Sequence, residues 1–163
     1  MKDIVYGEKV ALDNTDKKII QVLYSDGRMP ISEMSRKTGI RRDIIVYRLK
    51  KMLENDVVSF ILPILNPPKL GFQNLNTVNI RIQNFEKKLE DEFISFLKNN
   101  KNIIYVSVLS GNWDYNVLIA SKNPEHFNEI IKDMRSKFSN FIKEFDVSMV
   151  IKEPKYENML GLL

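Results

Sequence analysis

Residues 36–51 read RKTGIRRDIIVYRLKK, a glycine-containing turn followed by a strongly basic segment. Seven of these sixteen residues are Lys or Arg and one is Asp, so the segment has a net charge of +6. The rest of the chain is closer to balance, because the whole protein carries only +4. Such a concentration of positive charge is typical of a contact with a nucleic-acid backbone, although the solvated face of a helix can have the same composition.

Three helices are predicted around this segment. The short polar side chains of residues 12–16 can accept the free backbone amides at the start of a first helix, which Gly27 ends. Pro30 suits the first turn of a short second helix, and the turn at residues 38–40 leads to a third helix over 41–54. A short helix, a turn and a longer helix form the helix-turn-helix layout.

The third helix has two distinct faces at about 100° per residue. The predicted core stripe consists of Ile45, Val46, Leu49, Met52 and Leu53. The opposite side consists of Asp43, Ile44, Tyr47, Lys50 and Lys51, with Arg41 and Arg48 along its edge. The basic cluster therefore lies on a helix whose other side is predicted to be buried.

The segment after the third helix is rich in β-forming residues. Residues 57–65 predict a small hairpin, or wing, and the Asn-Pro-Pro sequence at 66–68 then breaks regular structure. We therefore expect a winged helix-turn-helix domain over residues 1–61, a linker over 62–74 and a second domain over 75–163.

The second domain alternates strands and helices. Val78, Ile80 and Ile82 alternate with polar residues, as expected of a strand with one buried face. The elements predicted after it are a helix over 85–99, strands over 103–109 and 115–120, a helix that starts at Asn123 and a last strand over 145–151. The order β-α-β-β-α-β is the ferredoxin-like pattern, so the fold class of the whole chain is predicted to be α+β.

Composition excludes several classes of function. The chain has no Cys and a single His, His126, so disulfides, thiolate sites and two-histidine metal sites cannot form. No apolar run approaches the roughly 18 residues needed to cross a bilayer, and residues 1–10 lack a signal-peptide pattern, so we expect a cytoplasmic protein with no membrane partner. Because no Walker or dinucleotide glycine loop and no assembled acid and base are found, we expect neither a cofactor nor an enzyme.

An ordered series of short motifs runs along the chain. It comprises Leu12-Asp13-x-x-Asp16, Asp26-Gly27-Arg28, Gly39-Ile40 before a helix that contains Arg48-Leu49, Asn66-Pro67 before Leu70-Gly71, and Gly111-Asn112-Trp113-Asp114. This series resembles the Lrp/AsnC family of feast/famine transcription regulators over about residues 11–156. The resemblance implies a DNA-binding dimer that assembles further through its second domain, often in response to an amino acid.

Two positions depart from the family pattern. Arg41 stands where family members usually place a serine at the start of the recognition helix, so the usual N-cap is missing and a cation takes its place. Asp56 stands where a glycine is expected near the end of the same helix, which is expected to tilt the wing. The sequence specificity of other members therefore does not carry over.

The third helix is predicted to enter a major groove of double-stranded DNA. Residues expected to contact phosphates are Arg36, Lys50 and Lys51, and Arg42 belongs to the same basic cluster. Residues expected near base edges are Arg41, Asp43, Ile44, Tyr47 and Arg48.

Three of these residues have an alternative interpretation. Ile44 can pack on a thymine methyl group, but a stray exposed apolar residue is equally ordinary. Arg48 suits a structural ion pair with Asp13 or Asp16, and Tyr47 can pack within the three helices.

The residues Gly111, Asn112, Trp113 and Asp114 form a turn between two predicted strands. A glycine that tolerates positive φ and an aspartate that accepts backbone amides make an ordinary hairpin turn. The resemblance implies an effector site at a subunit interface, where Asp114 would pair with the ammonium group of an amino acid and backbone amides would hold its carboxylate. Both interpretations stay open.

The predicted function is that of a sequence-specific DNA-binding transcriptional regulator. It is expected to respond to a small effector such as an amino acid and to act as a homodimer or a higher, dimer-based homo-oligomer. The alternative is an effector-independent architectural DNA-binding protein of low specificity. The ratio of operator affinity to random-DNA affinity at fixed salt distinguishes the two.

Overall fold

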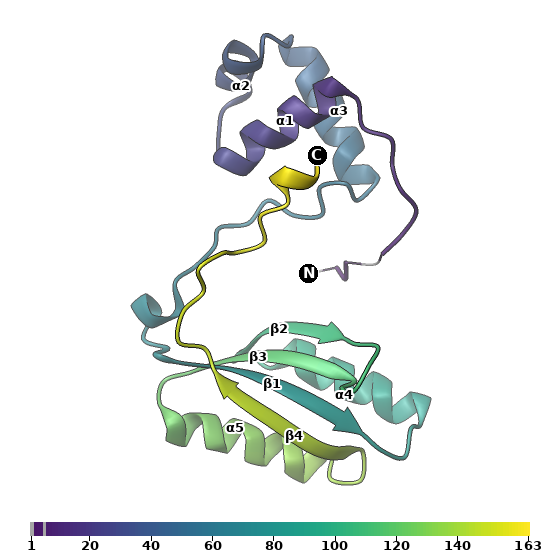
Figure 1. The fold of residues 1–163 in the computed structure, drawn as a ribbon, viewed down its shortest axis with the longest axis vertical. Helices are drawn as coiled ribbons and strands as arrows, with labels where there is room; N and C mark the ends of the chain where they lie inside the picture. Colours follow the sequence, from purple (N-terminus) through teal and green to yellow (C-terminus); the bar gives the residue numbers. More distant parts are fainter. Residues whose placement is uncertain (1, 5) are drawn as a thin grey trace. The chain divides into compact units, whose positions relative to one another are not determined.

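The computed structural model describes residues 2–4 and 6–163, which divide into two compact units. A helical unit contains the residues up to Ile64 together with Lys155–Leu163, and a sheet unit contains Leu65–Pro154 (Figure 1). The chain therefore leaves the helical unit and later returns to it. The last nine residues group with the helical unit, whereas the sequence assigned them to the second domain.

Three helices form the helical unit: α1 (Asn14–Ser25), α2 (Ile31–Thr38) and α3 (Arg42–Glu54). α1 begins with a reciprocal cap, in which the Asp13 carboxylate accepts the Asp16 amide at 2.9 Å and the Asp16 carboxylate accepts the Asp13 amide at 3.2 Å. The helices enclose a small core of Ile19, Met29, Met34, Ile45 and Met52. The predicted helix-turn-helix layout is confirmed.

Two features of the helical unit differ from the sequence prediction. Val46 and Leu53 belong to the predicted core stripe but are 53% and 37% exposed, because the core reaches only the side of α3 that carries Ile45 and Met52. The prediction of a wing at residues 57–65 was wrong, since no strand lies between α3 and the sheet unit in the described part of the chain. Pro63 lacks the backbone donor that a paired strand needs at its position.

The chain turns sharply as it leaves α3. Asp56 adopts the left-handed conformation with a φ of 55°, and the amides of Val57 and Val58 donate to the Met52 carbonyl at 2.9 and 3.2 Å. Ile61 then lies against the α1–α2 turn, where a Cβ added to Gly27 would come within 2.9 Å of the Ile61 Cγ2 atom. A side chain at position 27 would therefore require Ile61 to shift.

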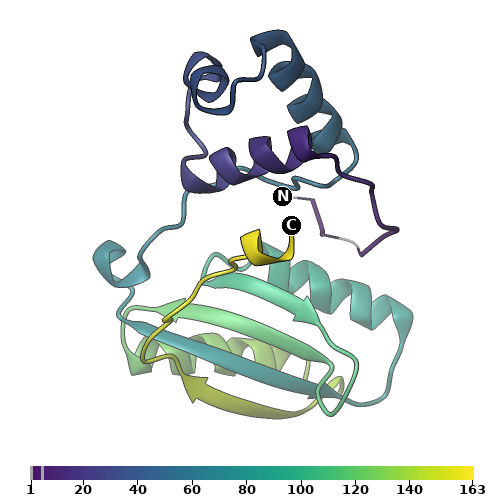
Figure 2. The ribbon, with the colours of Figure 1, turned by 45° about the horizontal axis from the view of Figure 1, so that its top comes forward.

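The sheet unit has four antiparallel strands in the spatial order β2-β3-β1-β4. Its elements are β1 (Asn74–Ile82), α4 (Lys87–Asn99), β2 (Ile103–Val108), β3 (Tyr115–Ser121), α5 (Pro124–Lys137) and β4 (Ile142–Met149). Figures 1 and 2 show α4 and α5 against the same face of the sheet. The ferredoxin-like order and the α+β class are confirmed. Two short 3₁₀ helices, η1 (Pro67–Leu70) and η2 (Leu160–Leu162), complete the chain.

An aromatic cluster forms the core of the sheet unit. Phe93 is fully buried and meets Tyr115, Phe138 and Phe141 edge-on, with ring centroids 5.3, 5.0 and 5.4 Å away. The Tyr115 hydroxyl donates to the Glu90 carboxylate at 2.9 Å, and burial together with this carboxylate raises the pKa of Tyr115. These contacts fix α4 and α5 against the sheet.

Candidate functional site

The turn before α3 is held by side chains that the sequence patterns did not single out. The Ser35 hydroxyl donates to the Ile40 carbonyl at 2.6 Å, and the Thr38 hydroxyl donates to the Met34 carbonyl at 2.7 Å. Gly39 takes the left-handed conformation at a φ of 72°. Hydroxyl groups that bond local backbone carbonyls are the signal that would have found these residues.

Arg41 is the N-cap of α3 and makes no side-chain cap. Its guanidinium instead donates to both carboxylate oxygens of Asp43, from Nε at 3.1 Å and from one terminal nitrogen at 3.0 Å. The two side chains are 78% and 65% exposed. A pair this exposed is weakly held and can exchange its partner for DNA.

The apolar and aromatic candidate side chains on α3 are exposed to solvent. Ile44 is 38% exposed and Tyr47 is 63% exposed. Tyr47 therefore does not take the packed position that was its structural alternative. Both side chains are accessible to a partner that approaches α3.

The remaining cations of the basic segment lie on α2 and α3. Arg36 lies 3.5 Å from Glu33, and Lys50 lies 3.7 Å from Glu54, both as exposed pairs within one helix. Within the described residues no ion pair involves Arg42 or Lys51. Exposed cations with weak partners or none are suited to phosphate contacts.

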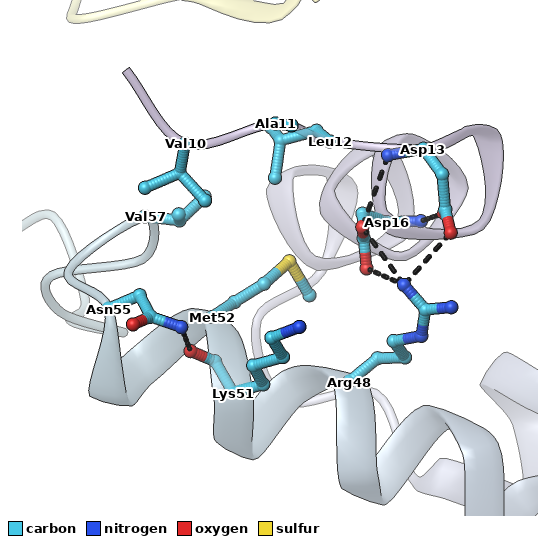
Figure 3. A pocket seen from close by; sticks show the side chains of 10 residues that line it. All are labelled: Val10, Ala11, Leu12, Asp13, Asp16, Arg48, Lys51, Met52, Asn55 and Val57. Atoms are coloured by element: carbon cyan, nitrogen blue, oxygen red, sulfur yellow. Dashed lines mark hydrogen bonds and ion pairs between the residues drawn. The ribbon is translucent and has the colours of Figure 1, made fainter. Parts of the chain in front are cut away.

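Arg48 occupies the structural position that was its alternative. Its guanidinium lies 2.9 Å from the Asp13 carboxylate and 3.2 Å from that of Asp16, which is buried (Figure 3). The Asp16 carboxylate raises the pKa of Arg48, with Asp13 adding to the effect. The Asp16 amide, aided by the Arg48 charge, lowers the pKa of Asp13. Arg48 thus ties α3 to the cap of α1.

The turn at 111–114 is tightly bonded to β1. The Asp114 carboxylate accepts the Ile82 amide at 2.8 Å, and the Asp114 amide donates to the Ile80 carbonyl at 3.0 Å. Arg81 donates to the Asn112 carbonyl at 2.8 Å and lies 5.0 Å from the centre of the Trp113 ring.

Gly111 has a φ of 158°, and a Cβ there would meet no atom within 4 Å. The backbone conformation, and not a lack of space, favours glycine at this position. The ordinary turn interpretation therefore accounts for the geometry of the loop, and the effector role of its residues stays a prediction.

The single histidine has a local role in α5. The His126 amide donates to the Asn123 side chain at 2.8 Å, and its ring accepts the Lys122 amide at 3.2 Å. Among residues 2–4 and 6–163, no group of three acidic or histidine side chains is placed to hold a metal ion. No helix in the same residues is long and apolar enough to span a membrane.

Comparison with known proteins matches each unit to a known type of domain. Residues 12–53 match the AsnC-type helix-turn-helix domain, and residues 77–160 match the Lrp/AsnC ligand binding domain. The chain is similar to the HTH-type transcriptional regulator FL11 of Pyrococcus horikoshii, with 32% identity over 76% of this chain and 80% of that protein. It is also similar to the proline dehydrogenase transcriptional activator of Rhizobium radiobacter, with 23% identity over 87% of this chain and 92% of that protein.

Solved structures share the fold. A Neisseria meningitidis transcriptional regulator in complex with L-Met superposes with a TM-score of 0.81 at 22% identity, over 94% of this chain and all of that one. An AsnC family regulator from Agrobacterium tumefaciens gives 0.80 at 20% identity, over 93% of this chain and all of that one. With both domain types matched in order, this chain belongs to the Lrp/AsnC family and is a transcriptional regulator, with a DNA-binding and a ligand-binding domain, and not an enzyme.

Proposed function

We propose that this regulator binds specific DNA sequences as a dimer or a dimer-based oligomer and that a small effector such as an amino acid modulates the binding. The observation that carries the proposal is the +6 segment, whose cations lie mostly exposed on and beside α3 behind a turn fixed by Ser35, Thr38 and Gly39. A rigid turn that presents an exposed basic helix is what entry into a major groove requires.

The side chains divide into two groups by chemistry. Phosphate contacts fall to Arg36, Arg42, Lys50 and Lys51, because their charges are unpaired or weakly paired. Base-edge contacts fall to Arg41, Asp43, Ile44 and Tyr47, which line the exposed first half of α3. Arg48 contributes indirectly, since its ion pairs with Asp13 and Asp16 set the orientation of α3.

Dimerisation is part of this proposal. A helix-turn-helix dimer reads two half-sites about one DNA turn apart, and a single unit makes too few contacts for tight specific binding. A footprint with two-fold symmetric protection supports it, whereas protection of one half-site by a monomer opposes it.

The effector is assigned to the turn at 111–114. Support comes from the match of residues 77–160 to a ligand-binding domain and from the L-Met complex of the Neisseria relative. A thermal-shift screen with the twenty amino acids tests the assignment, and Trp113 is a fluorescence reporter within the turn itself. If no amino acid changes the melting temperature or the Trp113 emission, the turn is only structural.

The decisive experiment is a salt titration of DNA binding. Operator fragments are first selected from genomic DNA by the wild-type protein. The double variant Lys50→Glu, Lys51→Glu is expected to weaken binding to all sequences and to flatten the slope of log affinity against log salt by about two, since each lost phosphate contact contributes about 0.9.

A matched control carries the same charge change elsewhere. Lys88→Glu, Lys132→Glu alters two exposed lysines of the sheet unit and is expected to preserve the slope. An unchanged slope in the α3 variant contradicts the groove assignment. Equal affinity of the wild type for operator and random DNA at fixed salt would instead identify an architectural DNA-binding protein.

A further inference from the structure

A cavity of about 250 Å³ lies in the helical unit, apart from the turn at 111–114 (Figure 3). Its walls are largely apolar: Val10, Ala11 and Leu12 on the segment before α1 face Met52 in the last turn of α3 and Val57 in the segment after it. The Arg48 ion pairs with Asp13 and Asp16 close one end. The cavity is thus an apolar hollow bounded by a few charged groups, which is the usual character of a small-molecule site.

The two carboxylates at this cavity are already fully engaged. Asp13 accepts the amides of Thr15 and Asp16 and pairs with Arg48. Asp16 accepts the Asp13 amide and contacts Arg48 through both oxygens. Neither acid offers a free negative charge to a ligand.

Lys51 is the charged group at the cavity that is available to pair with a ligand. Its ammonium has no ion-pair partner among the described residues, and Figure 3 shows the side chain running along α3 between Met52 and Arg48. An ammonium beside apolar walls is complementary to a carboxylate that carries a short hydrocarbon chain.

We propose that this cavity binds a small apolar monocarboxylate that has no amino group, such as a branched-chain 2-oxo acid. The carboxylate contacts Lys51 and the hydrocarbon chain lies between Ala11, Met52 and Val57. The volume corresponds to roughly eight water molecules at about 30 Å³ each, which suits a ligand of about this size. An α-amino acid is disfavoured because its ammonium, next to the carboxylate held by Lys51, would be repelled by the Lys51 ammonium, and both acids of the cavity are already paired with Arg48.

Lys51 then has two competing partners, a statement that rests on the proposed function. Lys51 is assigned there to a DNA phosphate, so a carboxylate bound to it removes one phosphate contact. By linkage, the bound ligand lowers the affinity for DNA by the same factor by which bound DNA lowers the affinity for the ligand. The helical unit would then sense an oxo acid independently of the amino-acid effector.

The test is a titration of the full-length protein without DNA. The probe is 4-methyl-2-oxopentanoate, and leucine is the matched control because it has the same carbon skeleton with an amino group in place of the keto group. Methyl NMR signals of Ala11 and Met52 report the cavity directly, so binding of leucine elsewhere does not interfere. The oxo acid is expected to shift both signals in a saturable way, and leucine is expected to leave them unchanged.

Two variants and a control define the contacts. Lys51→Met keeps the length of the side chain and is expected to weaken oxo-acid binding by about tenfold or more. Ala11→Phe fills the cavity, keeps Lys51 and is also expected to abolish binding. Lys50→Met, on the neighbouring lysine outside the cavity, is expected to bind normally. Circular dichroism spectra check that each variant is folded.

Three outcomes overturn the proposal: no saturable shift with the wild type, unchanged affinity in Lys51→Met, or equal shifts with leucine. None of them bears on DNA recognition, because DNA is absent from the titration. Conversely, if the protein fails to bind DNA, the cavity signals still report whether the oxo acid binds.

Discussion

The left-handed conformation of Asp56, just after α3, is expected to cost a measurable amount of stability. Asp56 has a φ of 55°, a conformation that costs an ordinary residue about 1–2 kcal/mol relative to glycine. Its carboxylate also pairs with Lys2, but the two side chains are 50% and 60% exposed. Comparing Asp56→Gly with Asp56→Ala separates the two effects, because both variants lose the ion pair and only alanine keeps the strain.

The expected difference follows from two opposing contributions. Relief of the strain favours the glycine variant by about 1–2 kcal/mol, whereas the greater freedom of glycine in the unfolded chain favours alanine by about 0.4–1 kcal/mol. We therefore expect Asp56→Gly to be about 1 kcal/mol more stable than Asp56→Ala. For a unit of this size that difference is about 4–8 °C in the melting midpoint.

The assay is thermal unfolding followed by far-UV circular dichroism. Trp113 is the only tryptophan and belongs to the sheet unit, so its fluorescence gives an internal control that both substitutions should leave unchanged. An alanine variant as stable as the glycine variant would refute the strain, and with it the idea that the turn after α3 is conformationally demanding.

Three further predictions concern pH and base preference. Because the pKa of Asp13 is lowered in the folded state, its contribution to stability is present above pH 3.8 and is lost as the pH falls through the folded-state pKa. The Asp13→Asn variant should therefore lose less stability than the wild type between pH 7 and pH 3, measured by denaturant unfolding. Equal losses in the two proteins contradict this expectation. Because the pKa of Tyr115 is raised in the folded state, its contribution to stability is lost as the pH rises above about 10. The Tyr115→Phe variant should therefore lose less stability than the wild type between pH 9 and pH 11. An equal loss would count against the buried hydrogen bond to Glu90. Ile44→Ala should change the preference at one base step without changing the salt dependence, measured on single-base operator variants; an identical preference profile opposes a contact between Ile44 and a base.

The elements of the fold follow largely from local signals. The Asp13 cap, the left-handed Gly39 and the Asn123 cap each mark an element boundary through a side chain or backbone preference that acts within a few residues. The alternation in β1 is likewise a local property, because the helices cover one face of the sheet. These signals require no knowledge of distant parts of the chain.

The predictions that were wrong concern features that depend on packing between distant parts of the chain. Val46 and Leu53 lie within the apolar arc of α3, but the width of the buried arc depends on how much of α3 its neighbours reach. Residues 57–65 have the composition of strands, yet composition does not supply a strand to pair with. β4 starts at Ile142, earlier than predicted, because Lys143 and Glu144 hide the apolar alternation, although Ile142 and Glu144 pair with β1 on either side of a register shift at Lys143.

The candidate site shows the same division. Charge and helical position found the exposed cations of α3, but the choice for Arg48 between DNA and an ion pair depended on where α1 begins in space. The bonds of Ser35 and Thr38 were missed because hydroxyl groups have many ordinary uses in a sequence. The cavity beside Lys51 joins segments about forty residues apart, which no local pattern reveals.

The return of the chain to the helical unit has a consequence for biosynthesis. Leu65–Pro154 is one uninterrupted segment, so the sheet unit is built from a single stretch of chain, whereas the helical unit is assembled from two separate stretches. The helical unit acquires its second stretch, including the bond from the Tyr24 hydroxyl to the Glu157 carbonyl, only after the whole sheet unit has been synthesised. A tag fused at either end of this chain would therefore be attached to the helical unit, because the residues up to Ile64 and Lys155–Leu163 both belong to it.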